Sequence, residues 1–557
     1  MLRVKKGYKQ SLWYFAPVLA ITLPWFFKPG YLFFTDFVMG PHIILDWNSA
    51  SFLFNLIIKF LAYFTPIDIL QKFFISSILL ILLVGSKKLI EETIRLTTDN
   101  AQEPRHWLVF ILSLFTVFNP FVYDRIMYGQ FGIVAALGFL ILSLGNIFAY
   151  LRTKSIKNMV WFGVFAGFMA LSSVHFIAFL FLLTILLLTY GLIKKQVSGK
   201  ILLKHLALAL IIILVLNINW ILGLKNPDSR LGNFIKKGVT NKELIAFQTS
   251  GKTNGEVITN VLMMSGFWGK DQMRYSDLTQ SESNWQRSFF FLLPIILVGL
   301  TISFKNKHSR FLSGGFVILF IIACTLAIGV RLPISREITQ LLHYYLPPYV
   351  AFREPQKWVA VIVVIYLFYL TTGAHYLLIK RIIKKNELLS GIILSSIIIL
   401  QAPLLLLGLN GQVTPTEYPE DWHEINRYIT LNQPSNERGC NGNILFLPWH
   451  LYMSFNWIGN VVANPTPKFF TCLVISGTNM EWGGIDNDSP DVKSTLVSEW
   501  IKKQGNTDLL SPKTLNITYL ILAKEVDWQK YLWIETLPSL TLVMETPSLK
   551  LYQVNSP

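Results

Sequence analysis

An aspartate stands among apolar residues just after the first hydrophobic segment of this chain. Asp36 lies in the stretch YLFFTDF, residues 31–37. Apolar surroundings raise the pKa of a carboxyl group, which suits a general base, whereas a nearby cation or metal ion would keep the group ionised. A solvated loop carboxylate, or a cap for a following helix, would explain the same residue without any chemistry. Both interpretations remain open for Asp36, and Asp46 is a weaker second acid that is better explained as a cap.

A second group of charges lies in the stretch NPFVYDRIMYGQFG, residues 119–132. The planar guanidinium of Arg125 is suited to binding a phosphate, and Asp124 could hold that guanidinium or a metal ion. The alternative is an internal pair between Asp124 and Arg125 that closes a tight turn. These two interpretations are compatible with each other, so this turn is a candidate phosphate site.

A third group of charges lies in the stretch FREPQKW, residues 352–358. Glu354 and Pro355 are common residues at a helix start, and we expect them to be structural. Arg353 and Lys357 are less ordinary there, because cations at a helix N-terminus oppose the helix dipole. Two such cations at one helix start indicate a site that binds an anion.

Known signatures of soluble enzymes are absent from the sequence. It contains no GxxxxGK[ST] loop for phosphate, no GxSxG elbow, no HExxH and no CxxC pair. The formal net charge is +17, but the basic residues form small clusters beside apolar runs instead of a stripe with base-stacking aromatics. We therefore expect no nucleic-acid partner.

The elements that position these charges are membrane helices. Hydrophobic residues make up 52% of the 557 positions and charged residues only 15%, and roughly 20 apolar residues suffice to cross a bilayer. We predict an α-helical polytopic membrane protein with about 11 transmembrane helices. The predicted helices cover residues 12–28, 68–86, 106–121, 130–150, 158–173, 176–193, 204–222, 288–304, 311–330, 357–379 and 388–409.

Basic residues in the short loops predict the orientation of these helices. Cytoplasmic loops are enriched in Lys and Arg, and every second predicted loop is basic. An N-terminus in the cytoplasm and an odd number of helices place everything after Leu409 outside, in a protein integral to the cell membrane. The basic clusters are Lys5–Lys6, Lys87–Lys88, Arg152–Lys157, Lys194–Lys200, Lys305–Arg310 and Lys380–Lys385.

Long external loops and a polar tail complete the predicted organisation. A transmembrane domain, residues 1–409, carries large external loops at 29–67, 223–287 and 331–356, and loops of this size on one face usually build a site. The second half of the first of these loops is amphipathic and is expected to lie in the membrane interface. Residues 410–557 are predicted to form a small extracytoplasmic α/β domain, with buried strands at 443–448 and 518–522.

Three cysteines are too few for a disulfide framework. Cys324 lies inside an apolar run, which leaves Cys440 and Cys472 as one possible pair. An extracytoplasmic domain would allow that pair to oxidise. The sequence leaves open whether it does.

The combination of these features resembles the GT-C glycosyltransferases. The motifs at 119–132 and 352–358 look in particular like the membrane proteins grouped with arabinofuranosyltransferases and the YfhO-like proteins, and the tail with TEYPEDW, NILFLPWH and NITYLILAKE is similar. This resemblance implies that a sugar moves, with inversion, from a polyprenyl-phosphate-linked donor to an extracytoplasmic glycan or glycolipid acceptor in a membrane lipid environment.

The same resemblance implies roles for the candidate residues. Asp36 would be the base that deprotonates the acceptor hydroxyl. Arg125, Arg353 and Lys357 would bind the lipid phosphate, with Asp124 beside them, and we expect these groups to meet above the bilayer. Asp36 lacks the paired acid of a DxD or ExD motif, so the cofactor is unknown, with a divalent ion such as Mg²⁺ or Mn²⁺ as one option.

Two other classes of protein share the layout of this sequence. A lipid or polysaccharide transporter or flippase would also have many helices and external cations, and a non-catalytic assembly protein could keep the fold without the site. A transporter should carry ionisable residues or broken helices near the middle of the membrane. Here the unusual charges gather near one face, which favours the enzyme.

Overall fold

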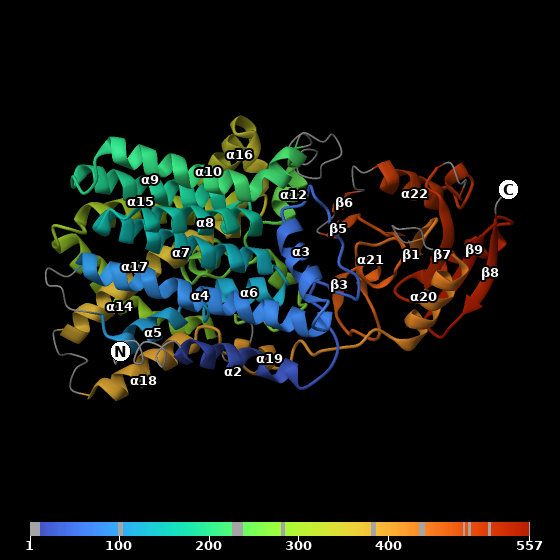
Figure 1. The fold of residues 1–557 in the computed structure, drawn as a ribbon, viewed down its shortest axis with the longest axis horizontal. Helices are drawn as coiled ribbons and strands as arrows, with labels where there is room; N and C mark the ends of the chain where they lie inside the picture. The colour runs from blue at the N-terminus through green and yellow to red at the C-terminus, as the bar shows by residue number, and fades with distance from the viewer. Residues whose placement is uncertain are drawn as a thin grey trace. The chain divides into compact units, whose positions relative to one another are not determined.

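A computed structural model of the chain describes residues 12–97, 104–224, 238–279, 285–379, 386–433, 440–482, 485–487, 492–510 and 514–555. Two compact units are present and are considered separately (Figure 1). The helical unit consists of Met1–Pro24, Asp46–Phe52 and Phe73–Gln412, and the sheet unit of Trp25–Leu45, Leu53–Lys72 and Val413–Pro557. The predicted division into residues 1–409 and 410–557 stays a prediction. Lys5, Lys6 and the basic cluster at Lys380–Lys385 lie outside the described residues.

Long apolar helices form most of the described chain before Gln412 and alternate with short ones. The longer helices are α2 (Phe15–Phe26), α4 (Ile67–Thr97), α7 (Phe131–Thr153), α8 (Ile156–Ser172), α9 (Phe176–Ile193), α10 (Gly199–Gly223), α14 (Phe289–Lys305), α15 (Arg310–Ile328), α16 (Pro333–Tyr345), α17 (Val359–Ile379) and α18 (Glu387–Ile399). The short elements are η1 (Leu12–Tyr14), α5 (His106–Leu114), α6 (Pro120–Met127), α12 (Asn241–Ala246), α13 (Asn254–Leu262), η2 (Trp268–Gln272), η3 (Trp285–Ser288), η4 (Gly329–Arg331), η5 (Pro347–Phe352), η6 (Pro355–Trp358), η8 (Pro403–Leu405) and α19 (Leu406–Asn410).

The helices confirm a polytopic helical membrane protein, whereas the predicted number of spans is not confirmed. Among the described residues, 7 helices are long and apolar enough to cross a membrane, or 8 if one bent pair counts as a span. The predicted span 106–121 is instead the helix α5 of 9 residues followed by turns. The predicted span 388–409 bends by 79° between Ile399 and Pro403.

The two predicted helices at 158–173 and 176–193 correspond to α8 and α9, with a turn between them. Helix α8 ends at Ser172 and helix α9 begins at Phe176, with His175 just before it. Helix α8 packs against α7 and α10, and α7 also packs against α9 (Figure 1). The interior of the unit is formed by α7 and α17, since 89% of the apolar window of each is buried.

Two glycines allow α14 and α17 to cross at close range. A Cβ atom on Gly299 would lie 1.8 Å from the carbonyl oxygen of Tyr369, and one on Gly373 would lie 2.0 Å from that of Ile295. Small residues are used in this way at membrane helix contacts, because the hydrophobic effect does not drive one helix against another inside lipid. This crossing fixes α17, which follows directly from the FREPQKW segment.

The sheet unit is built on five strands in the order β4-β1-β7-β9-β8. Strand β1 (Asn443–Leu447) is parallel to β4 (Val474–Ile475) and β7 (Ile517–Ala523), whereas β9 (Leu549–Val554) is antiparallel to β7 and β8 (Leu540–Glu545). The other elements are α3 (Phe52–Leu61), α20 (Glu420–Asn432), α21 (Thr466–Phe469), α22 (Val492–Lys502), η9 (Asp508–Leu510), η10 (Trp528–Thr536) and the short strands β2 (Tyr452–Ser454), β3 (Val461–Ala463), β5 (Met480–Trp482) and β6 (Ile485–Asn487).

Alternating side chains of the sheet enter two separate cores. Phe446 and Ile521 pack with Trp422 of α20, whereas the next residues along, Leu447 and Leu522, pack with Trp500 of α22. This alternation with a period of two residues places one helix on each face of the sheet. The predicted small α/β fold is confirmed.

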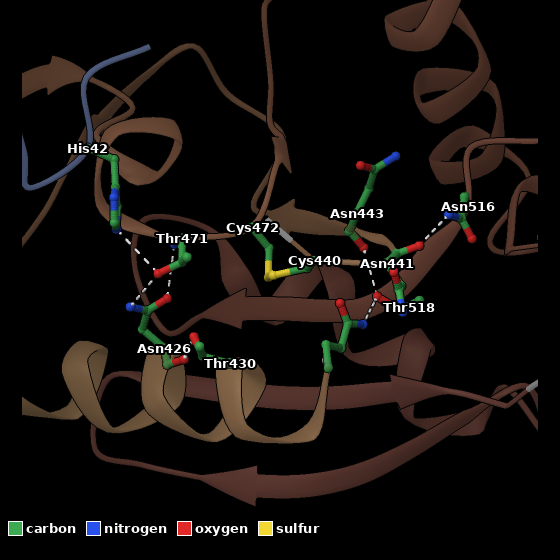
Figure 2. Close-up of a disulfide and its surroundings, with 11 residues drawn as sticks. His42, Asn426, Thr430, Cys440, Asn441, Asn443, Thr471, Cys472, Asn516 and Thr518 are labelled. Atoms are coloured by element: carbon green, nitrogen blue, oxygen red, sulfur yellow. Dashed lines mark hydrogen bonds between the residues drawn. A yellow bond between two sulfur atoms is a disulfide. The ribbon is translucent and has the colours of Figure 1, made fainter. Parts of the chain in front are cut away.

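A disulfide joins Cys440 and Cys472 in this unit (Figure 2). The two cysteines come just before β1 and β4, which are neighbouring parallel strands, and their Cα atoms are 5.2 Å apart. Beside the bridge, the Thr471 backbone N–H donates to Asn426 Oδ1 at 3.0 Å, and Asn426 Nδ2 donates to Thr471 Oγ1 at 3.2 Å. These bonds attach α20 to the start of β4.

Candidate functional site

The turn that carries Arg125 is specified by its own local sequence. Asn119 caps α6 by accepting a hydrogen bond from the Val122 backbone N–H at 3.0 Å, and Pro120 occupies the first helical position. Gly129 has a φ of +85°, which lets the chain reverse into α7. All 8 residues of α6 are buried. Much of the motif therefore builds the turn, and Arg125 is directed into the protein.

The segment that carries Lys357 is held by packing on both sides. Gly329 has a φ of +62°, and a Cβ atom there would lie 2.7 Å from Cγ of Pro355. Gln356 Nε2 donates to the Phe247 carbonyl oxygen at 3.0 Å and to Thr249 Oγ1 at 3.1 Å. Pro355 is at the start of η6, so the structural interpretation of this proline is confirmed.

Arg125 and Lys357 meet on one buried carboxylate. Arg125 Nη1 lies 3.1 Å from Glu354 Oε2, and Lys357 Nζ lies 3.4 Å from Glu354 Oε1. Trp268 Nε1 donates to the same carboxylate at 3.3 Å. We call Arg125, Glu354, Lys357 and the adjoining His175 the Glu354 cluster. Arg125 and Glu354 are 229 positions apart in the sequence, so the fold brings together two of the predicted charged motifs.

The Glu354 cluster carries more positive charge than its one carboxylate balances. Arg125 Nη1 also donates to the side-chain oxygen of Gln130, and the ring of Phe267 lies 4.3 Å from the guanidinium carbon. Arg125 Nε and Nη2 are buried and have no hydrogen-bond partner among the described residues. Buried polar groups are normally paired. A cationic side chain with two such nitrogens is suited to binding an anion.

Arg353 is next to the cluster but is arranged differently. Its guanidinium carbon lies 4.8 Å from the centre of the Phe247 ring, and its charge helps to keep Glu354 ionised. Burial on its own would raise the pKa of Glu354, but the charges of Lys357 and Arg125 outweigh burial and hold that pKa below its usual range. Glu354 is therefore a carboxylate, and the cluster has two cations on one anion.

His175 is a neutral member of the cluster. Its Nε2 lies 3.0 Å from Lys357 Nζ, and its Nδ1 lies 3.0 Å from Ser173 Oγ. Burial, together with the charge of Lys357, holds the pKa of His175 well below its ordinary value. An unprotonated Nε2 accepts a hydrogen bond from Lys357, which assigns the ring proton to Nδ1 facing Ser173.

We expect Glu354→Gln to destabilise the protein by about 3–5 kcal/mol, because removing one partner of a buried ion pair leaves uncompensated charge. Here both Arg125 and Lys357 would lose their carboxylate. Thermal unfolding of the detergent-solubilised protein measures the effect. Glu337→Gln is the matched control, since Glu337 lies exposed on α16. Equal unfolding temperatures for the two variants would contradict the described cluster.

Asp124 contacts a different group of residues from Arg125. Its Oδ1 accepts a hydrogen bond from Tyr275 Oη at 3.1 Å, and nearby Lys270 Nζ lies 3.6 Å from Asp277 Oδ2. Tyr123 Oη donates to the Ser276 carbonyl oxygen at 2.5 Å. Asp124 and Arg125 form no ion pair with each other in the described part of the chain. The described structure therefore has no direct Asp124–Arg125 ion pair: the two side chains bind different partners, while the charge of Asp124 still acts on Arg125.

Asp124 should make stability depend on pH. Burial, followed by the charge of Asp277, raises the pKa of Asp124 to about 7, with Lys270 acting in the opposite direction. The native protein thus keeps a proton that the unfolded chain loses near its ordinary pKa of about 4. Stability from this group is complete below that value and falls as the pH rises through about 7.

We expect Asp124→Asn to flatten this dependence between pH 5 and pH 8. The wild type should unfold at a lower temperature at the higher pH, and the variant should lose that difference. Thermal unfolding at both pH values measures it. Asp46→Asn is the control, because the Asp46 side chain accepts the local Asn48 N–H of an exposed turn at 3.0 Å. The same slope in Asp124→Asn as in the wild type would disprove this origin.

The described residues do not fit a divalent metal ion. No group of three or more His, Cys, Asp or Glu side chains within the described ranges is placed to hold one. Asp124 accepts a hydrogen bond from Tyr275, and Asp277 pairs with Lys270. No chemical step is therefore assigned to Mg²⁺ or Mn²⁺, and the cofactor of the protein stays unknown.

Asp36 lies in the sheet unit on a segment fixed by backbone bonds. Tyr31 and Thr416 exchange two of these bonds at 2.9 Å, and the Ala463 N–H donates to the Thr35 carbonyl oxygen at 2.8 Å. Tyr452 Oη donates to Asp36 Oδ1 at 2.8 Å. The Asp36 side chain is exposed, whereas its neighbour Phe33 is buried in the core of this unit. The expected apolar surroundings of Asp36 are thus wrong, because the adjacent apolar side chains turn inward.

Comparison with known proteins identifies the fold. No protein-family model matches the chain, and no curated protein matches it. The cryo-EM structure of the arabinofuranosyltransferase AftD from Mycobacteria matches with a TM-score of 0.61 at 12% identity, over 99% of this chain and 40% of AftD. The chain has the GT-C fold. This GT-C-like chain thus covers less than half the length of AftD.

Two further solved structures are less similar to this chain. The oligosaccharyltransferase AglB from Archaeoglobus fulgidus, solved with an inhibitory peptide and a dolichol-phosphate, matches with a TM-score of 0.42 at 12% identity, over 92% of this chain and 65% of AglB. ArnT from Cupriavidus metallidurans, solved with undecaprenyl phosphate, matches with a TM-score of 0.34 at 10% identity, over 91% of this chain and 88% of ArnT.

Sequence reasoning identified the cations of this GT-C-like chain better than the acid that binds them. It selected Arg125 and Lys357, which the fold brings together, and it treated Glu354 as a helix-start residue. Glu354 makes no side-chain cap hydrogen bond and binds both cations instead. Its position between Arg353 and Lys357 was the available signal. The functional roles of Asp36, Asp124, Arg125, Arg353 and Lys357 stay predictions.

Proposed function

We propose that this chain is an integral membrane glycosyltransferase that moves a sugar from a polyprenyl-phosphate-linked donor to an extracytoplasmic glycan or glycolipid, with inversion. The observation that carries this proposal is the Glu354 cluster, where two cations from distant motifs share one carboxylate and Arg125 retains unpaired N–H groups. Such a group fits a phosphate better than it fits an uncharged sugar. The GT-C fold supports a donor of this class.

The cations act on the leaving group of the proposed reaction. Arg125 Nε and Nη2 donate to phosphate oxygens, and Lys357 and Arg353 add positive charge. Negative charge grows on the lipid phosphate as its bond to the anomeric carbon breaks, and positioned donors stabilise that charge. Glu354 fixes the positions of Arg125 and Lys357, so it is a positioning residue and not a catalytic one.

Asp36 is proposed to act on the acceptor. Its carboxylate takes the proton from the acceptor hydroxyl while the hydroxyl oxygen attacks the anomeric carbon. The new bond forms on the side opposite the phosphate, which inverts the configuration. The lipid phosphate leaves with the electron pair of the broken bond. Tyr452, which donates to Asp36 Oδ1, orients the carboxylate.

The proposed orientation puts the N-terminus in the cytoplasm and the α/β domain outside, in the cell membrane. Basic loops at alternate helix ends support this orientation. The Cys440–Cys472 disulfide supports it as well, because such bonds persist in oxidising compartments outside the cytoplasm. Membrane lipids, the lipid-linked donor and the glycan acceptor are the proposed partners.

Transfer by the purified protein tests the proposal. Radiolabelled polyprenyl-phosphate sugars are supplied to the protein in lipid vesicles with a set of glycan and glycolipid acceptors. We expect label to move from the lipid phosphate to an acceptor, with inverted anomeric configuration. Label that crosses the vesicle bilayer while still attached to the lipid would overturn the enzyme in favour of a flippase. No transfer and no movement with any donor would favour a non-catalytic assembly protein.

A further inference from the structure

A separate group of basic residues lines a cavity away from the Glu354 cluster. This cavity, which we call the basic pocket, has a volume of about 510 Å³. The last turns of α4, α7 and α9 and the connections that follow α7, α9 and α14 surround it. Its lining consists of Glu92, Arg95, Leu96, Phe148, Leu151, Arg152, Lys154, Tyr190, Lys194, Lys195, Gln196 and His308.

Cations outnumber acids in this lining by 5 to 1, counting lysine and arginine against Glu92. Glu92 is already engaged, because Arg152 donates to it through Nε and Nη2 at 2.7 Å each and Arg95 Nη1 donates at 2.7 Å. Lys194 Nζ donates to the carbonyl oxygen of Lys307 at 3.0 Å. Lys154 and Lys195 contact no carboxylate in the described part of the chain. The pocket therefore has positive charge left for a ligand.

Helix α7 gives the position of the pocket relative to the Glu354 cluster. It begins directly after Gln130, the partner of Arg125, and ends at Thr153 beside the pocket. Its 23 residues rise about 34 Å at 1.5 Å each, close to the roughly 30 Å of a hydrocarbon core. Helix α9 likewise runs from His175 to the pocket. The two basic sites therefore lie at opposite ends of helices that are long and apolar enough to cross a membrane.

The basic pocket is lined by apolar side chains as well as by cations. Leu96, Phe148 and Leu151 line it together with the lysines. On α9, Leu192 and Ile193 are exposed next to Lys194, as expected for side chains in contact with lipid. Basic pockets between helices at a membrane boundary bind phospholipid headgroups. We propose that the basic pocket binds the phosphate of an anionic membrane phospholipid.

Lipid binding by the full-length protein in detergent tests the proposal. Phosphatidylglycerol, phosphatidylcholine and inorganic phosphate are the probes, and native mass spectrometry measures the bound fraction. The test variant is Lys154→Gln with Lys195→Gln, both exposed residues. The matched control is Lys200→Gln with Lys204→Gln, which removes the same charge from exposed positions near the start of α10 that do not line the pocket.

We expect phosphatidylglycerol to bind more tightly than phosphatidylcholine and to lose about thirtyfold in affinity in the test variant, given the attraction per lysine at a membrane surface. The control pair should keep most of the wild-type affinity. Equal affinities in both variants, or no preference over phosphatidylcholine in the wild type, would overturn the proposal. Displacement by an equal concentration of inorganic phosphate would also overturn it, by showing a site for a free anion.

Discussion

Replacing Asp36 with asparagine is expected to lower the rate of sugar transfer by roughly 10²- to 10⁴-fold, the usual contribution of a positioned general base. Asparagine keeps the shape of the side chain and can still accept the hydrogen bond from Tyr452, but it cannot take a proton from an acceptor hydroxyl at neutral pH. The effect should fall on kcat, because the variant retains the donor-binding cations. Single-turnover transfer from a labelled donor measures it.

Two comparisons separate a base from a residue that only maintains the loop. Asp46→Asn removes a second acid near Asp36 in the sequence and should leave transfer unchanged, because Asp46 serves a local turn. Tyr452→Phe removes the hydrogen bond to Asp36 without removing the carboxylate and should cost far less than Asp36→Asn. Full transfer activity in Asp36→Asn would exclude Asp36 as the base and would leave the membrane fold unaffected.

Replacing Arg125 with glutamine is expected to reduce transfer by roughly 10²- to 10³-fold, as for the loss of one donor to a developing negative charge. Arg125→Lys should fall between this variant and the wild type. Lysine keeps a positive charge but loses the planar fork that binds two oxygens at once. A full kinetic comparison of the three proteins separates the contribution of charge from that of geometry.

The fold of the Arg125 variants should survive better than that of Glu354→Gln. Removing Arg125 leaves Glu354 still paired with Lys357, so no carboxylate is left without a cation. Arg336→Gln, on the exposed face of α16, is the control with the same change of charge. Arg125→Gln with the transfer rate of Arg336→Gln and an unchanged affinity for the donor would remove Arg125 from the phosphate site.

Hydropathy predicted where helices occur but not how far each one extends. The apolar run from His106 continues through Phe115 and Val117, which suggested one span. Asn119 and Pro120, however, form a cap and a first helical position, so a new helix begins there. The capping residues were visible in the sequence. Apolar length alone does not distinguish one span from a short helix, a turn and another helix.

The sequence could not show which distant residues pair in the folded protein. Arg125 and Lys357 were recognisable because cations are unusual beside apolar helices, and this reasoning needed only local information. Their common partner Glu354 has an adequate local explanation at the start of a helix, and nothing local relates it to Arg125. Asp36 was misjudged for a similar reason, because neighbours in the sequence such as Phe33 turn into a core while Asp36 stays exposed.

The bridge between Cys440 and Cys472 leaves Cys324 as the remaining thiol of a chain with three cysteines. Cys324 lies partly buried in α15. A thiol-reactive spin label or fluorophore added without reductant would therefore report on a single helix of the native protein, with no need for engineered substitutions. Adding dithiothreitol would introduce two further attachment points, and the increase in labelling would measure how much of the bridge had opened.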